Sequence, residues 1–99
     1  MTVIEITLTS GAITPEDLQR LGEQFTQTLD NLSDVREIIL SGRMPVWAFA
    51  HLAVRAAGEG RAVATFDPRL QAGVVVWPAE QAGRLLPLTG EEERREIVI

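Results

Sequence analysis

The sequence contains no cysteine, no lysine and only one histidine, and these absences limit the kinds of site that it can form. Without cysteine there is no disulfide framework and no cysteine-based zinc site, and the single His51 rules out a multi-histidine metal cluster within one chain. All nine basic residues are arginines. Because the planar guanidinium binds phosphate oxygens two at a time, arginine is the residue from which we expect any contact to a small anion.

The sequence also lacks a basic leader and any apolar run long enough to cross a bilayer, so we expect a cytoplasmic protein with no membrane partner. The net charge of -5 argues against binding DNA or long RNA, because such binding requires a basic face. A length of 99 residues predicts a single domain over residues 1–99, whose modest core self-association would help to stabilise.

Two short motifs carry the functional information. The first, Ser41-Gly42-Arg43-Met44-Pro45-Val46-Trp47, follows the apolar run 37–40, and the second, Asp67-Pro68-Arg69-Leu70, follows the run 62–66. Each motif is therefore predicted to lie at the carboxyl end of a strand. Open α/β sheets bind their ligands at that edge.

The first motif has the composition of an anion site. Ser41 and Gly42 are predicted to form a tight turn, and Pro45 to open a helix, because the first position of a helix has no use for an N–H donor. The free N–H groups of the next residues then lie beside Arg43, and phosphate is the anion that such a site fits best. The predicted substrate-binding residues are Ser41, Gly42, Arg43, Met44 and Pro45.

The hydrophobic pattern predicts an α/β fold with a mixed sheet. Strands are expected over 3–8, 37–40, 62–66, 74–77 and 97–99, and helices over 15–32 and 45–57, with a polar connection over 79–89. Residues 68–73 are short enough for a tight hairpin, so the strand after them is expected to be antiparallel. The second helix is apolar almost all round, which places Trp47 in the core and predicts that the helix also packs against a second subunit.

Together, the two motifs and the Val74-Val75-Val76 strand resemble the CRISPR-associated Csx-three family of type III systems over about residues 36–77. The resemblance implies a compact Rossmann-like fold related to the CARF sensors, with two main helices and a mixed sheet in three layers or two. It also implies a homodimer, and cyclic tetra-adenylate as the ligand, held in a higher assembly between two dimers. The implied activity is that of a ring nuclease, which cleaves this second messenger with a dependence on Mn²⁺ and so switches the defence off.

Cleavage of such a ring has modest chemical requirements. Attack of a ribose 2′-hydroxyl on its neighbouring phosphate needs in-line positioning and stabilisation of charge on the phosphate oxygens. Arg43 and Arg69 are predicted to stabilise that charge, and Asp67 to accept the hydroxyl proton or to hold a divalent ion. Asp67 and Arg69 are therefore the predicted catalytic residues, and Asp67 is the predicted metal ligand.

Two other functions stay open at this point. The family's histidines, late in the second helix and after the valine strand, have no counterpart in Val54-Arg55-Ala56-Ala57-Gly58 or Trp77-Pro78-Ala79-Glu80. A non-catalytic protein that only sequesters the ring would fit this departure. In a protein-protein adaptor, the apolar second helix would be the interface, and Asp67 and Pro68 would serve only to make a turn.

Overall fold

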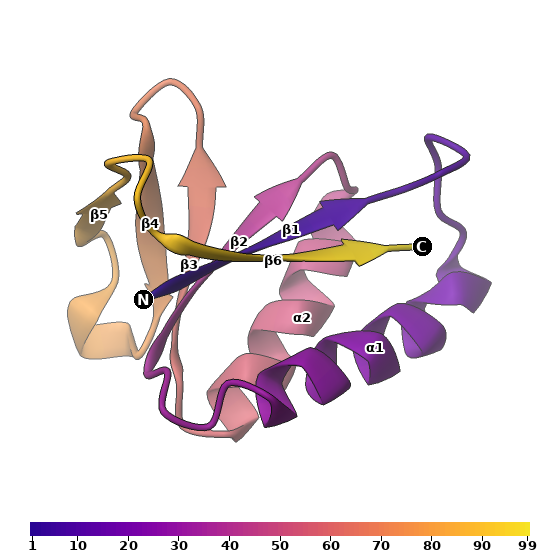
Figure 1. Ribbon diagram of the computed structural model, residues 1–99, viewed down its shortest axis with the longest axis horizontal. Coiled ribbons are helices and arrows are strands. Elements are labelled where there is room, and N and C mark those ends of the chain that lie inside the picture. Colours follow the sequence, from indigo (N-terminus) through magenta and orange to yellow (C-terminus); the bar gives the residue numbers. More distant parts are fainter.

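The computed structural model describes residues 1–99 and has an α/β fold built on one six-stranded mixed sheet (Figure 1). Two α-helices pack on this sheet, and two short 3-10 helices, η1 and η2, interrupt the connections. The elements are β1 (Thr2–Thr7), η1 (Pro15–Asp17), α1 (Leu18–Asp30), β2 (Glu37–Gly42), α2 (Val46–Gly58), β3 (Ala62–Asp67), β4 (Ala72–Trp77), η2 (Ala79–Gln81), β5 (Leu85–Pro87) and β6 (Glu93–Val98).

The strand order is β5-β4-β3-β2-β1-β6. Strands β1, β2, β3 and β6 run parallel, and β4 and β5 are antiparallel additions at one edge. The crossovers β1-α1-β2 and β2-α2-β3 advance across the sheet in the same direction, and connections of one hand put both helices on one face. The helices contact each other there, so the observed arrangement has two layers (Figure 1). Neither helix has the length and apolar character needed to cross a membrane.

The main core lies between the helices and the sheet. The apolar stripe that the sequence predicts on the first helix is buried at Leu21, Phe25 and Leu29, and it packs on alternate residues of β1 and β2. The helical segment starts at Pro15 as predicted, but its first turn is the 3-10 helix η1 and α1 begins only at Leu18. Thr14 and Asp17 form a capping box around Pro15, in which Asp17 accepts hydrogen bonds from the N–H and the hydroxyl of Thr14.

A second, smaller core lies on the opposite face of the sheet. Val3, Ile39, Ala64 and Val75 form a row across β1, β2, β3 and β4, and all four are buried. The connection from β5 to β6 joins the two edges of the sheet, and Leu86 and Leu88 from this part of the chain belong to the same cluster. No helix is therefore needed to cover this end of the second face.

One buried arginine ties the end of α1 to the start of β3. The Arg61 side chain is only 7% exposed, and its guanidinium donates hydrogen bonds to the carbonyl oxygens of Leu29, Leu32 and Val35 at 2.8, 2.6 and 2.9 Å. The final carbonyls of a helix have no partner within the helix, so a side chain that satisfies them stabilises the helix end. The sequence analysis assigned no role to Arg61.

Three sequence expectations were wrong. Ser41 and Gly42 do not form a turn but are the last residues of β2, paired with Glu5 and Ile6 of β1. The segment 79–89 is not only a polar connection, because η2 and β5 lie within it. Trp47 is not in the core: it is 37% exposed, because α2 turns only the Ala48, Leu52 and Ala56 face inward.

Candidate functional site

The carboxyl end of β2 is shaped by the close approach of β1. Gly42 has φ +137°, and a Cβ atom at this position would overlap the carbonyl oxygen of Ile6. Only glycine allows both this backbone angle and this contact. The two strands therefore stay paired up to Gly42, and the chain leaves the sheet at Arg43.

Arg43 and the start of α2 provide positive charge without a partner. Arg43 is exposed, and its guanidinium makes no hydrogen bond or ion pair within the chain. Pro45 occupies the N-cap position of α2, and no side chain caps the first turn of the helix. The first N–H groups of a helix carry a partial positive charge, so this corner of the molecule can bind an anion.

In the second motif, Asp67 and Arg69 are hydrogen-bonded to each other. The carboxylate of Asp67 accepts a hydrogen bond from the backbone N–H of Arg69 at 2.9 Å and two from its guanidinium, at 3.2 Å from Nε and 2.9 Å from Nη2. These bonds from Arg69 hold the pKa of Asp67 below its usual value. Asp67 is therefore ionised and paired rather than a free base, while Arg69 stays largely exposed.

The two motifs lie at the same edge of the sheet. Strands β2 and β3 are parallel neighbours in the register Leu40 to Thr65, so Gly42 and Asp67 end adjacent strands at similar heights. This placement agrees with the sequence prediction. No hydrogen bond or ion pair joins one motif to the other, which leaves the groups of both facing solvent at this edge.

The side chains of one chain do not form a metal centre. No three histidine, cysteine, aspartate or glutamate side chains lie close enough together to hold an ion. Asp67, the predicted ligand, is the only carboxylate of its motif and is bound by Arg69. The residues present thus do not fit a resident Mn²⁺ site within the chain.

A cavity of about 400 Å³ opens beside the first motif. It lies at the carboxyl ends of β1 and β2, and its wall continues into the loop after β1. Its lining consists of Glu5, Ile6, Thr7, Leu8, Gly11, Gly42 and Arg43. The cavity thus shares Gly42 and Arg43 with the predicted substrate-binding segment. Sequence reasoning found those two residues but missed the contribution of β1, because nothing in the β1 sequence marks Glu5 or Thr7 as different from other strand residues.

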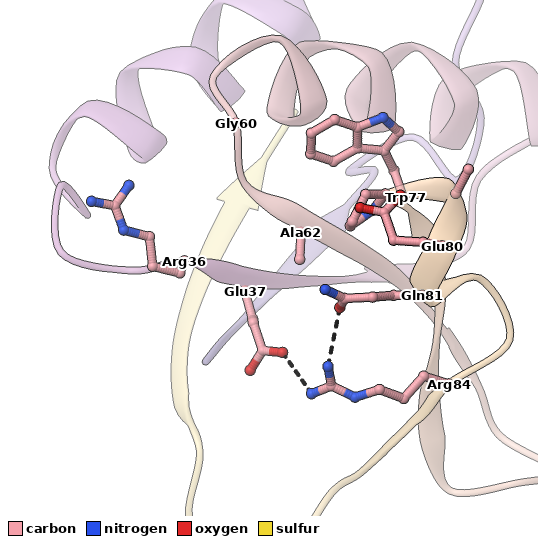
Figure 2. Close-up of a pocket in the computed structure, with 10 residues that line it drawn as sticks. Arg36, Glu37, Gly60, Ala62, Trp77, Glu80, Gln81 and Arg84 are labelled. Carbon is pink, nitrogen blue, oxygen red and sulfur yellow. Dashed lines mark hydrogen bonds and ion pairs between the residues drawn. The ribbon is translucent and has the colours of Figure 1, made fainter.

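A larger cavity, of about 670 Å³, lies at the opposite end of the parallel strands (Figure 2). Glu37 and Ala62 begin β2 and β3 there, and Trp77, Gln81 and Arg84 line the other side. Arg84 donates hydrogen bonds to Glu37 at 2.9 Å and to Gln81 at 3.0 Å. Arg84 and Glu37 neutralise each other in this cavity, and the exposed Arg36 also lines it.

His51 lies in neither cavity. Its Nε2 accepts a hydrogen bond from Nε of Arg55 at 3.0 Å, and Arg55 also donates to the hydroxyl of Thr26 on α1 at 2.8 Å. Gly22 of α1 packs on this group so closely that any side chain there would collide with it. Partial burial and the charge of Arg55 lower the pKa of His51. The histidine therefore belongs to the contact between α1 and α2.

Comparison with known proteins supports the reading of the two motifs. The family model described as CRISPR-associated protein (Cas_csx3) matches residues 6–84, a stretch that contains both motifs and the edge of the sheet where they lie. No curated protein and no solved structure shows a significant match to the chain.

Proposed function

The chain belongs to the CRISPR-associated Cas_csx3 family, and from this premise we propose that it binds cyclic tetra-adenylate in the cytoplasm and cleaves the ring. Under this proposal the protein is a ring nuclease that ends the signal carried by the second messenger. The observation that carries the proposal is the unpaired Arg43 beside the uncapped start of α2, at the edge of the sheet shared with Asp67 and Arg69.

This geometry supports phosphate binding. Arg43 supplies a full positive charge, and the first N–H groups of α2 supply directed donors. Arg69 lies at the end of the neighbouring strand, and its contact with Asp67 orients its guanidinium. A ring of phosphates and riboses lying along this edge would meet all three groups, whereas a single inorganic phosphate would reach only some of them.

Cleavage would use the ring's own 2′-hydroxyl. The 2′-oxygen attacks the adjacent phosphorus and the bond from phosphorus to the 5′-oxygen breaks. The leaving 5′-oxygen takes up a proton from water, and the products are a 2′,3′-cyclic phosphate and a 5′-hydroxyl. Arg43 and Arg69 would stabilise charge on the phosphate oxygens. Asp67 would act in one of two ways: it holds Arg69 in place, or, where ligand binding draws Arg69 away to the phosphate, it accepts the proton of the attacking hydroxyl.

A symmetric ligand requires more than one copy of the chain. A C2 dimer would present Arg43 and Arg69 twice around the ring, and a second dimer would enclose it. The surface of α2 supports a homodimer, because Val46 and Val54 on this helix are 82% and 70% exposed. Light scattering at micromolar concentration tests this part of the proposal, and a monomer mass would contradict it.

The test of the activity is direct. The protein is incubated with cyclic tetra-adenylate, with and without Mn²⁺, and the products are separated by chromatography and identified by mass. We expect tight binding and linear products with 2′,3′-cyclic phosphate ends. Cyclic tri- and hexa-adenylate serve as matched ligands that measure the preference for ring size. Failure to bind any ring would refute the proposal.

Capture without cleavage is the second candidate function. It is favoured by the closed contact between Asp67 and Arg69, which leaves no free base in the motif, and by the position of His51 between the helices. Tight binding with no product after many hours at excess protein would support it. Absence of nucleotide binding, together with a stable complex through α2, would instead indicate the adaptor.

A further inference from the structure

We propose that Glu5 of β1 recognises the ribose of the bound nucleotide by accepting a hydrogen bond from its 2′-hydroxyl. This inference rests on the proposed function and extends it from phosphate binding to discrimination between ribose and deoxyribose. The site is the cavity of about 400 Å³, which Glu5 and Arg43 line together. A cavity of this volume is within the range of small-ligand sites.

The strand register places Glu5 on the face of the sheet that carries no helix. Glu5 pairs with Ser41 of β2 on one side and with Glu96 of β6 on the other. Side chains alternate along a strand, so Glu5 is on the same face as Val3, which belongs to the core opposite the helices. Because Glu5 and Arg43 line the same cavity, a ligand held there by Arg43 has Glu5 beside it.

Glu5 has spare hydrogen-bonding capacity. Its one ionic neighbour is Arg94, with 3.9 Å between Nη1 and the carboxylate oxygen Oε1, which is too long for a hydrogen bond. An ionised carboxylate accepts hydrogen bonds and donates none. The cavity is thus lined by the Glu5 carboxylate, which accepts no hydrogen bond within the chain, and by Arg43, which has no partner.

Arg43 and Glu5 together match two neighbouring groups of a ribonucleotide, the phosphate and the 2′-hydroxyl. Arg43 favours an anion, and Glu5 favours a hydrogen-bond donor, because a second anion would repel it. Phosphate and the 2′-hydroxyl are adjacent in a 3′-5′ linked chain, and the 2′-hydroxyl is the only sugar hydroxyl left free in a closed ring. A site built to bind a hydroxyl discriminates against the analogue that lacks it, because its acceptor is then left unpaired.

The neighbouring strand provides a matched control. Glu96 lies directly opposite Glu5 on β6, but it already accepts a hydrogen bond from Thr7 at 3.0 Å and does not line the cavity. Its substitution removes the same charge from the same face of the sheet. A general electrostatic effect should therefore change the preference for the ribose ring in both variants. Loss of a contact to the 2′-hydroxyl should change it only when Glu5 is substituted.

The experiment measures dissociation constants for cyclic tetra-adenylate and for its 2′-deoxy analogue, with the wild type, Glu5→Ala, Glu5→Gln and Glu96→Gln. We expect the wild type and Glu96→Gln to prefer the ribose ring by about tenfold or more. Glu5→Ala should lower that preference to about threefold or less, and Glu5→Gln should fall between, because a neutral acceptor forms the weaker bond. Thermal unfolding confirms that each variant is folded.

Two results would overturn the inference while leaving the proposed function intact: equal affinity of the wild type for both rings, or an unchanged preference in Glu5→Ala. A preference lost equally in Glu96→Gln would also overturn it, since that result indicates a field effect rather than a contact. If the wild type binds neither ring, the proposed function fails, and the role of Glu5 fails with it.

Discussion

The two ends of the parallel strands differ in how their arginines are used. At the amino end, Arg61 is buried with three carbonyl partners and Arg84 is paired with Glu37, whereas the exposed Arg36 has no partner. At the carboxyl end, Arg43 has no partner, and Arg69 is exposed apart from its contact with Asp67. Satisfied charges stabilise a fold, whereas unsatisfied ones are available to a ligand. Arg61 and Arg84 therefore contribute to the fold, while Arg43 stays available for the ligand of the proposed function.

The size of a cavity does not by itself identify the candidate site in this protein. The larger cavity is at the amino end, where Arg84, Glu37 and Gln81 already satisfy one another (Figure 2). The smaller one is next to the matched family motif. Here the chemistry of the lining residues is more informative than the volume.

The largest expected effect is on stability at the amino end. Arg61→Ala removes hydrogen bonds to three carbonyl groups, of which those of Leu29 and Leu32 are buried, and should lower the free energy of unfolding by about 3 kcal/mol. Urea unfolding followed by circular dichroism measures this change. Arg36→Ala, at an exposed arginine of the same end, is the control and should alter stability little. Equal stability of Arg61→Ala and wild type would contradict a stabilising role for the hydrogen bonds of Arg61.

The next largest effect is on the rate of cleavage at the carboxyl end. Asp67→Asn keeps the volume of the side chain but loses the charge that orients Arg69, and should lower the single-turnover rate by a factor on the order of 10² with the ring still bound. Asp34→Asn, in the exposed connection before β2, is the control. Rates that agree within a few-fold would exclude Asp67 from the chemistry.

Arg43→Ala should weaken ring binding by roughly tenfold to a hundredfold, as expected for the loss of a charge-assisted hydrogen bond to phosphate. The melting temperature of the unliganded protein should stay nearly the same, because Arg43 has no partner in the folded chain. Calorimetric titration and thermal unfolding measure the two quantities. An unaltered dissociation constant would assign Arg43 to the solvated surface.

A smaller effect is expected for His51 of α2, on the pH dependence of the free energy of unfolding. Burial and Arg55 lower its pKa in the folded protein below the usual 6.5, so the unfolded state binds the proton first. The stability due to neutral His51 is thus fully present above pH 6.5 and is lost as the pH falls through the lowered pKa. His51→Gln should flatten this part of the stability profile between pH 7.5 and 5.5. The same slope in both proteins would show that other groups cause it.

The smallest effect is expected for ligand binding at the amino end. Arg84→Ala opens the contacts with Glu37 and Gln81 but should leave the affinity for cyclic tetra-adenylate within about twofold of wild type, because Arg84 lies at the opposite end of the strands from Arg43. A large loss of affinity would mean that the ring binds in the larger cavity and would reverse the assignment of the two ends.

Much of the fold was predictable because local pattern and burial agree. The stripe of Leu21, Phe25 and Leu29 has the spacing of a helix that covers a sheet, and it is buried as expected. The hairpin between β3 and β4 follows from its short loop. Strand β5 was missed because its three residues are too few to show a period and form a strand only by pairing with β4.

The candidate site was predictable in part. Its β2 and β3 residues are marked by motifs at the ends of apolar runs, and the parallel register brings them to one edge. The turn expected at Ser41 and Gly42 was wrong, because a Ser-Gly pair is typical of a turn unless a neighbouring strand approaches closely enough to continue the pairing. Glu5 was not predictable at all, since only the order of the strands places it beside Arg43.

The sequence by itself determined the α/β class, the start of the first helix, and the two motifs that identify the family, because each depends on residues that are close together in the chain. Only the tertiary structure decided which arginines have hydrogen-bond partners within the chain and which have none. Arg61 finds its carbonyl partners about thirty residues earlier in the chain, and Arg43 finds none. The identity of a charged residue is local, but whether it is satisfied depends on distant groups that folding brings together.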